Sequence, residues 1–371
     1  MSFEKFAKTP IIDCHTHFLN PKKVEDTWKL ISKVGFHKIV LLSLIDENKV
    51  NYNPEVLLLK TQHPELFFAF GSLDYFHLFR GSQSVPLPDQ VDLITNIGFD
   101  GIKMVEGKPN VRKMLGVRFD SVFYESYFER LEEKRIPLLF HVADPEEFWD
   151  PKKVPSWAKE QGWFYDSTYP TKAQLYEEVG NVLDRHDDLR VIFAHFYFLS
   201  GNIDAASSFL DKYKNVLLDI TPGIEMYYNF SNDHSSWRDF FIKYQDRILF
   251  GTDANSEQDV ESAVARIWFV RNFLETDSVF EMPSESDSLL KGSIAYFTGF
   301  GLPNSVLEKL YYGNFVKLVG HNPKKINLNL AVEECYRLAK EEAILKDKPI
   351  HETSAFTCAE ELKNILRIYK S

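Results

Sequence analysis

Two histidines, His15 and His17, end a short apolar run that begins at Ile11. In a β-strand, side chains at alternate positions point to the same face, so both imidazoles would project together. Two imidazoles on one rigid strand could supply half of the ligands of a divalent metal ion. Two ordinary polar residues at a strand end would have the same spacing, so this motif needs support from elsewhere in the chain.

The chain provides that support by repeating one pattern, an apolar segment that ends in a polar residue. Lys103, His141, His195 and Asp253 each stand at such an end. Apart from the lysine, these are residue types that bind zinc, manganese or iron. Each has an ordinary explanation when taken alone, such as a hydrogen-bonded histidine or, for Asp253, a helix cap. Their joint occurrence favours a metal site.

Eight apolar segments that alternate with helical patterns must position these side chains. They are predicted as strands over residues 11–17, 38–44, 66–74, 101–106, 137–142, 191–195, 216–220 and 248–253. Residues 107–117 and 275–292 are predicted as loops. Near-continuous apolar strands are typical of a parallel sheet that is buried on both faces. Their number predicts an α/β fold, a closed (β/α)8 TIM barrel, in which the strand ends meet at one mouth. An open doubly wound sheet is the alternative, but its Gly-rich phosphate loop is missing.

The predicted domains are a barrel over residues 1–320 and a C-terminal helical extension over 321–371. Helical spacing in residues 328–339 and 359–369 carries the prediction for the extension. We expect it to pack on the outside of the barrel. A contact between subunits, and hence a homodimer, is the alternative role.

Composition excludes several classes of protein. The 371 residues include 43 basic and 54 acidic side chains, a net charge of −11, which argues against nucleic-acid binding. The three cysteines, Cys14, Cys335 and Cys358, have neither disulfide-framework nor zinc-ribbon spacing. No segment has the pattern of a signal peptide or the length of a membrane span, so we expect a cytoplasmic enzyme whose partner is a small-molecule substrate.

The order of the motifs is specific to one superfamily. It consists of Asp-x-His-x-His at residues 13–17, His141, Ala194-His195, Gly-Thr-Asp at 251–253 and the closing segment 312–320. This order resembles the amidohydrolase superfamily, and the closing segment resembles its amidohydrolase-related branch. That branch contains metal-dependent decarboxylases, lactonases and carbon–carbon hydrolases.

The resemblance implies a set of roles. One divalent ion, zinc ahead of manganese or iron, would be held by His15, His17, His141 and Asp253. Asp253 would also move a proton from water, and His195 would act as general acid or base or polarise a carbonyl. Lys103 would be either a carboxylated bridge between two metals or a free amine that binds a substrate carboxylate. The branch favours one ion and the free amine.

Substrate recognition should come from the loops that follow the strands. The candidates are Lys103, Asp144, Arg118, Tyr197 and Glu225. Asp144 could instead cap a helix before Pro145, and Arg118 could be a solvated arginine or form a salt bridge at a helix start. Glu106 is predicted to be a solvated loop carboxylate. The tryptophan-rich segment 148–165 could form a lid or pocket wall, or pack on the barrel.

The predicted function is hydrolysis of a lactone, ester or amide. Non-oxidative decarboxylation of a small aromatic or unsaturated acid is the alternative on the same scaffold. A binding protein without activity would require a damaged ligand set, and all expected ligand types are present. An aromatic wall with a cationic group would favour decarboxylation, whereas an open cleft with room for water would favour hydrolysis.

Overall fold

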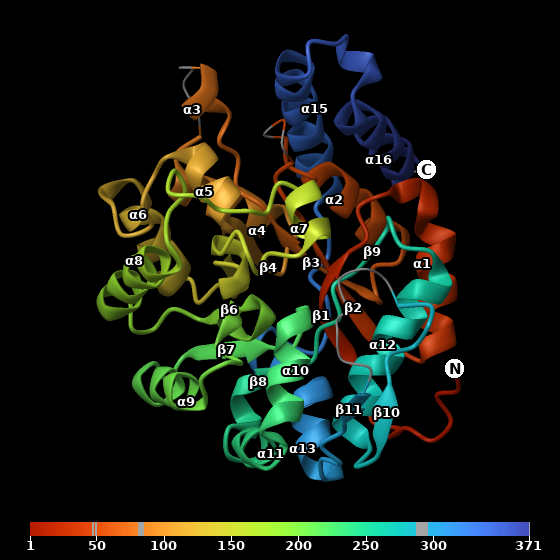
Figure 1. Ribbon diagram of the computed structural model, residues 1–371. Coiled ribbons are helices and arrows are strands. Elements are labelled where there is room, and N and C mark those ends of the chain that lie inside the picture. Colours follow the sequence, from red (N-terminus) through yellow and green to blue (C-terminus); the bar gives the residue numbers. More distant parts are fainter. Residues whose placement is uncertain (47, 49, 81–84, 287–295, 371) are drawn as a thin grey trace.

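The computed structural model describes the chain except for residues 47, 49, 81–84, 287–295 and 371. Within the described residues, one parallel sheet has the strand order β8-β7-β6-β5-β4-β3-β2-β1-β9 (Figure 1). Its strands are β1 (Ile12–His17), β2 (Lys38–Leu42), β3 (Phe67–Gly71), β4 (Gly101–Gly107), β5 (Leu138–Val142), β6 (Val191–Phe193), β7 (Val216–Asp219), β8 (Ile248–Leu249) and β9 (Ala254–Asn255). Neighbours in sequence are neighbours in space, as the predicted barrel requires.

The sheet closes on itself through its last strand. β8 pairs with β7 and β9 pairs with β1, and only four residues separate β8 from β9. Across this seam Cys14 N donates to Phe250 O at 3.0 Å, and Asp253 N donates to His15 O at 2.8 Å. β8 and β9 are therefore two halves of one strand, and the prediction of a (β/α)8 barrel is confirmed.

Helices surround the barrel or cover its ends. They are α1 (Val24–Val34), α2 (Asn53–Gln62), α3 (Phe76–Arg80), α4 (Leu87–Ile97), α5 (Pro109–Leu115), α6 (Val122–Glu133), α7 (Ser156–Glu160), α8 (Lys172–Arg185), α9 (Ile203–Lys212), α10 (Ile224–Asn232), α11 (His234–Lys243), α12 (Val260–Glu275), α13 (Asn304–Glu308), α14 (Asn314–Leu318), α15 (Leu328–Leu345) and α16 (Ser354–Lys370). Short helical turns are η1 (Pro21–Lys23), η2 (Glu146–Trp149), η3 (Ala194–Phe198), η4 (Gln245–Arg247), η5 (Lys309–Gly313) and η6 (Ile350–Glu352). None of the described helices is both long and apolar enough to cross a membrane.

The strands are buried on both faces, as their apolar composition predicts. Inside the barrel a compact cluster contains Val40, Phe68, Phe70, Leu139 and Ile192, and Phe315 of α14 packs against it. The opposite strand faces join the larger core between sheet and helices. This double burial fixes the strands, so the side chains at their C-terminal ends are held on a rigid frame.

Three local expectations were wrong. Residues 109–115 form a helix instead of a loop, with Pro109 at its start and Gly116 in the left-handed conformation at its end. β6 ends at Phe193, and the chain then turns through four residues with positive φ, from His195 to Phe198. The loop expected over 275–292 contains β10 (Val279–Glu281), which pairs with β11 (Tyr296–Thr298); residues 287–292 of that expectation lie outside the described residues.

The C-terminal extension forms a helical hairpin. α15 and α16 pack against each other and against α2, and they stand together at the upper edge of the molecule in Figure 1. Cys335 and Cys358 are buried. The hairpin therefore covers the barrel on the side of the loop between β2 and α2.

Candidate metal centre and active-site cavity

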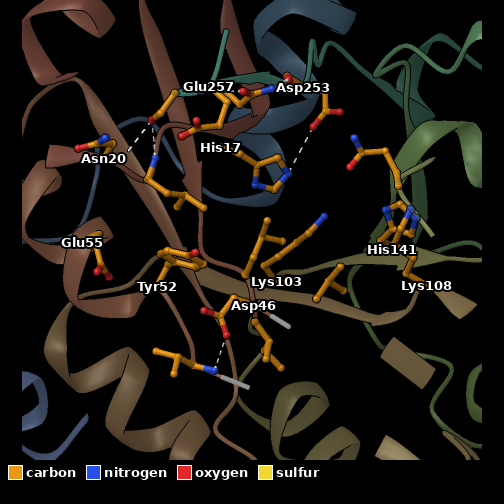
Figure 2. Close-up of a pocket in the computed structure, with 18 of the residues that line it drawn as sticks. His17, Asn20, Asp46, Tyr52, Glu55, Lys103, Lys108, His141, Asp253 and Glu257 are labelled. Atoms are coloured by element: carbon orange, nitrogen blue, oxygen red, sulfur yellow. Dashed lines mark hydrogen bonds and ion pairs between the residues drawn. The ribbon is translucent and has the colours of Figure 1, made fainter. Parts of the chain in front are cut away.

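His15, His17 and Asp253 form a compact group at the barrel mouth. The two Nε2 atoms are 3.2 Å apart, and Asp253 Oδ1 lies 3.7 Å from His15 Nε2 and 3.4 Å from His17 Nε2. Figure 2 shows the carboxylate of Asp253 facing His17. Two strand-end residues from β1 thus meet a residue from the opposite end of the sheet, as closure of the barrel requires.

The hydrogen bonds of the two imidazoles fix which nitrogen carries the proton. His15 Nδ1 donates to Asp219 Oδ2 at 2.8 Å, and His17 Nδ1 donates to Leu42 O at 3.2 Å. Burial is the main cause that lowers the pKa of both imidazoles, and the pKa of His17 falls to about 4. Both rings are therefore neutral at pH 7. Their Nε2 lone pairs therefore face each other at a distance that suits a shared cation. This donor set fits a divalent metal ion.

Asp253 is ionised in this group. Burial alone would raise its pKa, but the neighbouring His17, His15 and Arg266 outweigh burial and lower it. Arg266 also holds the main chain, because its Nη1 donates to Asp253 O at 3.0 Å. The alternative role as a helix cap is wrong, since α12 is capped by Asp259, which accepts from Ser262 N.

Asp219 at the end of β7 connects two of the histidines. Besides accepting from His15 Nδ1, its other oxygen accepts from His195 N at 2.8 Å and from Thr221 N at 3.1 Å. A carboxylate behind a ligating imidazole orients the ring and fixes its tautomer. Sequence reasoning missed Asp219, although a carboxylate within the apolar segment 216–220 was a signal that could have identified it.

His195 follows β6 in the left-handed turn. Its ring centroid lies 5.3 Å from that of His15 and 4.8 Å from that of His141. Nδ1 is 3.3 Å from Thr221 O, and a carbonyl only accepts, so Nδ1 carries the proton and Nε2 bears the lone pair. Burial lowers its pKa well below the usual value. In this state His195 can accept a proton or bind a cation.

His141 lies beside the group but is oriented differently. Its Nε2 is 3.0 Å from Ala143 O and 3.3 Å from Asp144 Oδ1, so it donates to both, and Nδ1 is the unprotonated nitrogen. His141 is not part of the compact group that the described residues form. As a metal ligand it would bind through Nδ1, and this role stays a prediction.

Asp144 is the centre of a second polar group. Both of its oxygens accept from Lys108 Nζ at 3.0 Å, and Oδ2 also accepts from Tyr165 OH. These partners and His141 outweigh burial and lower its pKa. The alternative of a helix cap is wrong, because the N-cap position of the turn that follows, η2, is occupied by Pro145. Lys108, which sequence reasoning missed, also lies over the ring of Trp163 at 4.0 Å.

Lys103 of β4 lies inside the site, as predicted from its position. Its Nζ is 3.4 Å from His15 Nε2, and its side chain is buried. Burial lowers its pKa to about 8. We call His15, His17 and Asp253 the metal group. The structure therefore brings Lys103 to the metal group, where either a free amine or a carboxylated lysine could act.

These side chains open onto a cavity of about 930 Å³ (Figure 2). Its aromatic wall consists of Phe148, Trp157, Trp163 and Phe198, and the tryptophans belong to the segment predicted as a lid or wall. The lining also includes residues of the C-terminal hairpin: Glu342, Lys346, Ser354, Thr357, Cys358 and Glu361. Their contribution was not predicted, because a sequence of helical spacing does not say which surface a helix covers.

The remaining candidates separate into two groups. Glu225 lines the cavity, neither of its carboxylate oxygens has a hydrogen-bond partner among the described residues, and burial raises its pKa to about 7. Arg118 and Tyr197 are not among the residues that line it. Arg118 is 46% exposed and binds Asp120 through two hydrogen bonds of 2.9 Å, which matches its salt-bridge alternative. Tyr197 is buried among aromatic rings of β6 and α9.

Glu106 does not match its expectation as a solvated loop carboxylate. It is fully buried, and its Oε1 accepts from Tyr75 OH at 2.9 Å. Burial raises its pKa to about 7. The expectation failed because β4 continues to Gly107 and keeps this side chain buried.

Comparison with known proteins supports this architecture. A search of curated proteins finds no match. Among solved structures, an uncharacterised TIM-barrel protein from Bordetella bronchiseptica has a TM-score of 0.53 at 13% identity, covering 84% of this chain and 99% of that one. 2,6-Dihydroxybenzoate decarboxylase from Rhizobium has a TM-score of 0.52 at 14% identity, covering 84% of this chain and 98% of that one. 5-Carboxyvanillate decarboxylase from Sphingomonas paucimobilis has a TM-score of 0.51 at 10% identity, covering 84% of this chain and 99% of that one. At these identities the likeness concerns the fold alone.

The family follows from sequence instead. The sequence model described as amidohydrolase matches residues 88–320, which is more than half of the chain and contains His141, His195 and Asp253. His15 and His17 precede the matched range, and the closed barrel brings them to Asp253. The match ends before α15, so the C-terminal hairpin lies outside it. By this match the chain belongs to the amidohydrolase family.

Proposed function

We propose that the protein is a metal-dependent hydrolase of a small carbonyl compound such as a lactone, ester or amide. The observation that carries this proposal is the pair of neutral imidazoles, whose Nε2 lone pairs converge beside an ionised carboxylate. Zinc is the proposed ion, with manganese or iron as alternatives, and one ion per chain is proposed. When bound, such an ion supplies Lewis acidity and water activated near pH 7.

The side chains divide the work of hydrolysis. Asp253 accepts the proton of the attacking water as the new carbon–oxygen bond forms. His195 Nε2 is the further proton acceptor that the fixed tautomer makes available. The carbon–oxygen or carbon–nitrogen bond to the leaving group then breaks, and the leaving group takes up the proton that Asp253 received from the water. Lys103, in the free-amine form that we propose, holds a negatively charged oxygen of the substrate.

Decarboxylation is the second candidate, and the cavity wall favours it. Phe148, Trp157 and Trp163 offer aromatic faces, and Lys103 and Lys108 offer cations near the metal group. An aromatic acid could lie against this wall with its carboxylate toward Lys103. In that reaction the carbon–carbon bond to the carboxylate breaks, carbon dioxide leaves, and a proton takes its place on the ring carbon.

Isotope labelling separates the two reactions. Zinc-loaded protein is incubated with a panel of lactones, esters, amides and hydroxybenzoates in water enriched in oxygen-18 and deuterium. Hydrolysis places one oxygen-18 atom in the product acid. Decarboxylation instead releases carbon dioxide and places deuterium on carbon. Deuterium on carbon without oxygen-18 in the product would replace the hydrolase proposal with the lyase.

Metal content is tested separately. Elemental analysis of the purified protein should give one ion per chain, and intact mass should show Lys103 without an added carboxyl group. Two ions per chain would overturn the free amine and assign Lys103 to a bridge. The matched control is His15→Ala, which should lower the metal content while near-ultraviolet circular dichroism shows an intact fold.

A further inference from the structure

The cavity has a second polar end, away from the metal group. Figure 2 shows Glu55, Tyr52 and Asp46 together on the side of the cavity opposite His141. Glu55 belongs to the first turn of α2, and the C-terminal hairpin packs on that helix. We call this end, formed by Asp46, Glu55, Glu342, Lys346, Ser354 and Glu361, the distal end.

Negative charge exceeds positive charge at the distal end. Lys346 pairs with Asp46 at 3.4 Å and with Glu342 at 3.3 Å, and Lys348 pairs with Glu342 at 3.0 Å. Both lysines are thus engaged by Glu342, and Lys346 is also engaged by Asp46. Among the described residues neither lysine forms an ion pair with Glu55, so the distal end keeps an uncompensated acidic side chain.

Glu55 itself is buried and incompletely bonded. Its side chain is 5% exposed, it lines the cavity, and its Oε2 has no hydrogen-bond partner among the described residues. Ser354 of α16 hydrogen-bonds the carboxyl group, and burial raises its pKa to about 7. A buried polar atom without a partner lowers the stability of the folded state, so a protein rarely keeps one unless something else satisfies it.

The surroundings indicate which group could satisfy Glu55. Val50, Leu58 and Cys358 provide apolar surface beside it, and the cavity is continuous from there to His17 and Lys103. A carboxylate in apolar surroundings binds a cation with hydrogen-bond donors more strongly than an uncharged donor. A ligand entering from the metal end could therefore place an ammonium group against Oε2.

We propose that the distal end is a cation subsite, which takes a primary ammonium or guanidinium group at the far end of the substrate. The substrate class becomes an amine-bearing ester, lactone, amide or carboxylic acid, with its reacting group at the metal and its amine at Glu55. This inference rests on the proposed function for the identity of the reacting group. The hairpin thereby acts as a specificity element, although it lies outside the family match.

The test measures binding and not turnover. n-Hexylamine and hexan-1-ol, which share one alkyl chain, are titrated calorimetrically into zinc-loaded protein at pH 8. The wild type should bind the amine at least about tenfold more tightly than the alcohol. In Glu55→Gln this preference should fall to about one. Glu65→Gln removes an exposed carboxylate close to α2 and outside the cavity, and it should keep the preference.

A second variant keeps the test decisive if Glu55→Gln does not fold. Thr357 is exposed and lines the cavity on α16, one turn from Ser354 of the distal end, so Thr357→Trp fills the subsite without disturbing the core. It should weaken amine binding at least tenfold. Equal binding of amine and alcohol by the wild type, or an amine preference that survives both variants, would overturn the proposal.

The binding test of the subsite and the turnover test of the proposed reaction can fail independently of each other. A protein that prefers the amine but converts none of the labelled carbonyl or carboxyl compounds would retain the subsite and lose the proposed reaction. A protein that hydrolyses its substrate but treats amine and alcohol alike would retain the reaction and lose the subsite.

Discussion

Two carboxylates in one cavity, Asp253 and Glu55, are in opposite electrostatic states. Both are desolvated, which raises the pKa of an acid. Around Asp253 the imidazoles and Arg266 reverse that effect, and its pKa is lowered. Around Glu55 burial outweighs the hydrogen bond from Ser354 and the charge of Lys346, and its pKa is raised to about 7. Burial alone therefore does not determine the state of a buried acid; the positive and hydrogen-bonding groups supplied by the fold do.

The difference follows from the elements that hold each carboxylate. Asp253 sits between the two halves of the last strand, and its main chain bonds to β1. Glu55 is held by a helix and by Ser354 of the C-terminal hairpin, which supply hydroxyl and apolar groups. A barrel mouth gathers side chains from many strands, whereas a helix packed on helices offers few partners.

The largest expected effect is at the metal end. Asp253→Asn keeps the size of the side chain but removes the proton acceptor, so turnover should fall by about 10²–10⁴-fold. His15→Ala should abolish turnover by removing a proposed metal ligand. Steady-state rates of the zinc-loaded variants, with circular dichroism as the folding control, check both. Retained turnover in either variant would refute the assigned roles.

A stability measurement sharpens the comparison at the distal end. The unfolded chain releases the Glu55 proton near pH 4.5, but the folded chain keeps it until about pH 7. The unfolded state therefore binds fewer protons in this window, and rising pH makes Glu55 increasingly destabilising. Glu55→Gln lacks this cost.

The free energy of unfolding of Glu55→Gln minus that of the wild type should thus increase by about 2 kcal/mol between pH 5 and pH 8. Urea titrations at the two pH values measure the difference. A pH-independent difference between the proteins would show that Glu55 has an ordinary pKa, and the contrast with Asp253 would be lost.

A third change tests how the metal end is held. In Asp219→Asn the amide nitrogen would face the His15 Nδ1 proton, which favours the other tautomer and places a proton on Nε2. Zinc affinity should fall about 10–100-fold. Competition with a chromophoric chelator measures it, and Asp120→Asn, outside the cavity, is the control. Unchanged affinity would mean that the tautomer of His15 is fixed by another group.

The smallest effect is expected at Arg118, which lies away from both the metal group and the distal end. Arg118 is half-exposed, pairs with Asp120 and does not line the cavity. Arg118→Ala should leave kcat and KM within about twofold of wild type, because exposed ion pairs contribute little. A large rise in KM would place the guanidinium in substrate binding after all.

The sequence predicted those parts of the site that local periodicity determines. Alternation along a strand places His15 and His17 on one face, and a barrel brings Asp253 to them. The start and end of α5 were also readable, since Pro109 and Gly116 are ordinary helix boundary residues. Its assignment as a loop gave too much weight to glycines and charges.

The rest depends on tertiary contacts that no local pattern encodes. Lys108 is charged and follows a strand, but only the fold shows that it pairs with Asp144. The orientation of His141 is set by Ala143 O and Asp144. The hairpin joins the cavity wall although Ser354 lies about 300 residues from Glu55 in the chain. Helical spacing predicts that a helix has a buried face, but it does not predict which part of the fold that face contacts.

The interruption between β8 and β9 has a thermodynamic consequence. The residues that complete the cylinder, from Phe250 to Asp253, also carry a candidate metal ligand. A ligand that binds only the closed cylinder adds its binding free energy to the free energy of unfolding. Amide hydrogens of Cys14 and Asp253 should consequently exchange with solvent more slowly as zinc concentration rises, so occupancy of the mouth can be followed through the backbone without any substrate.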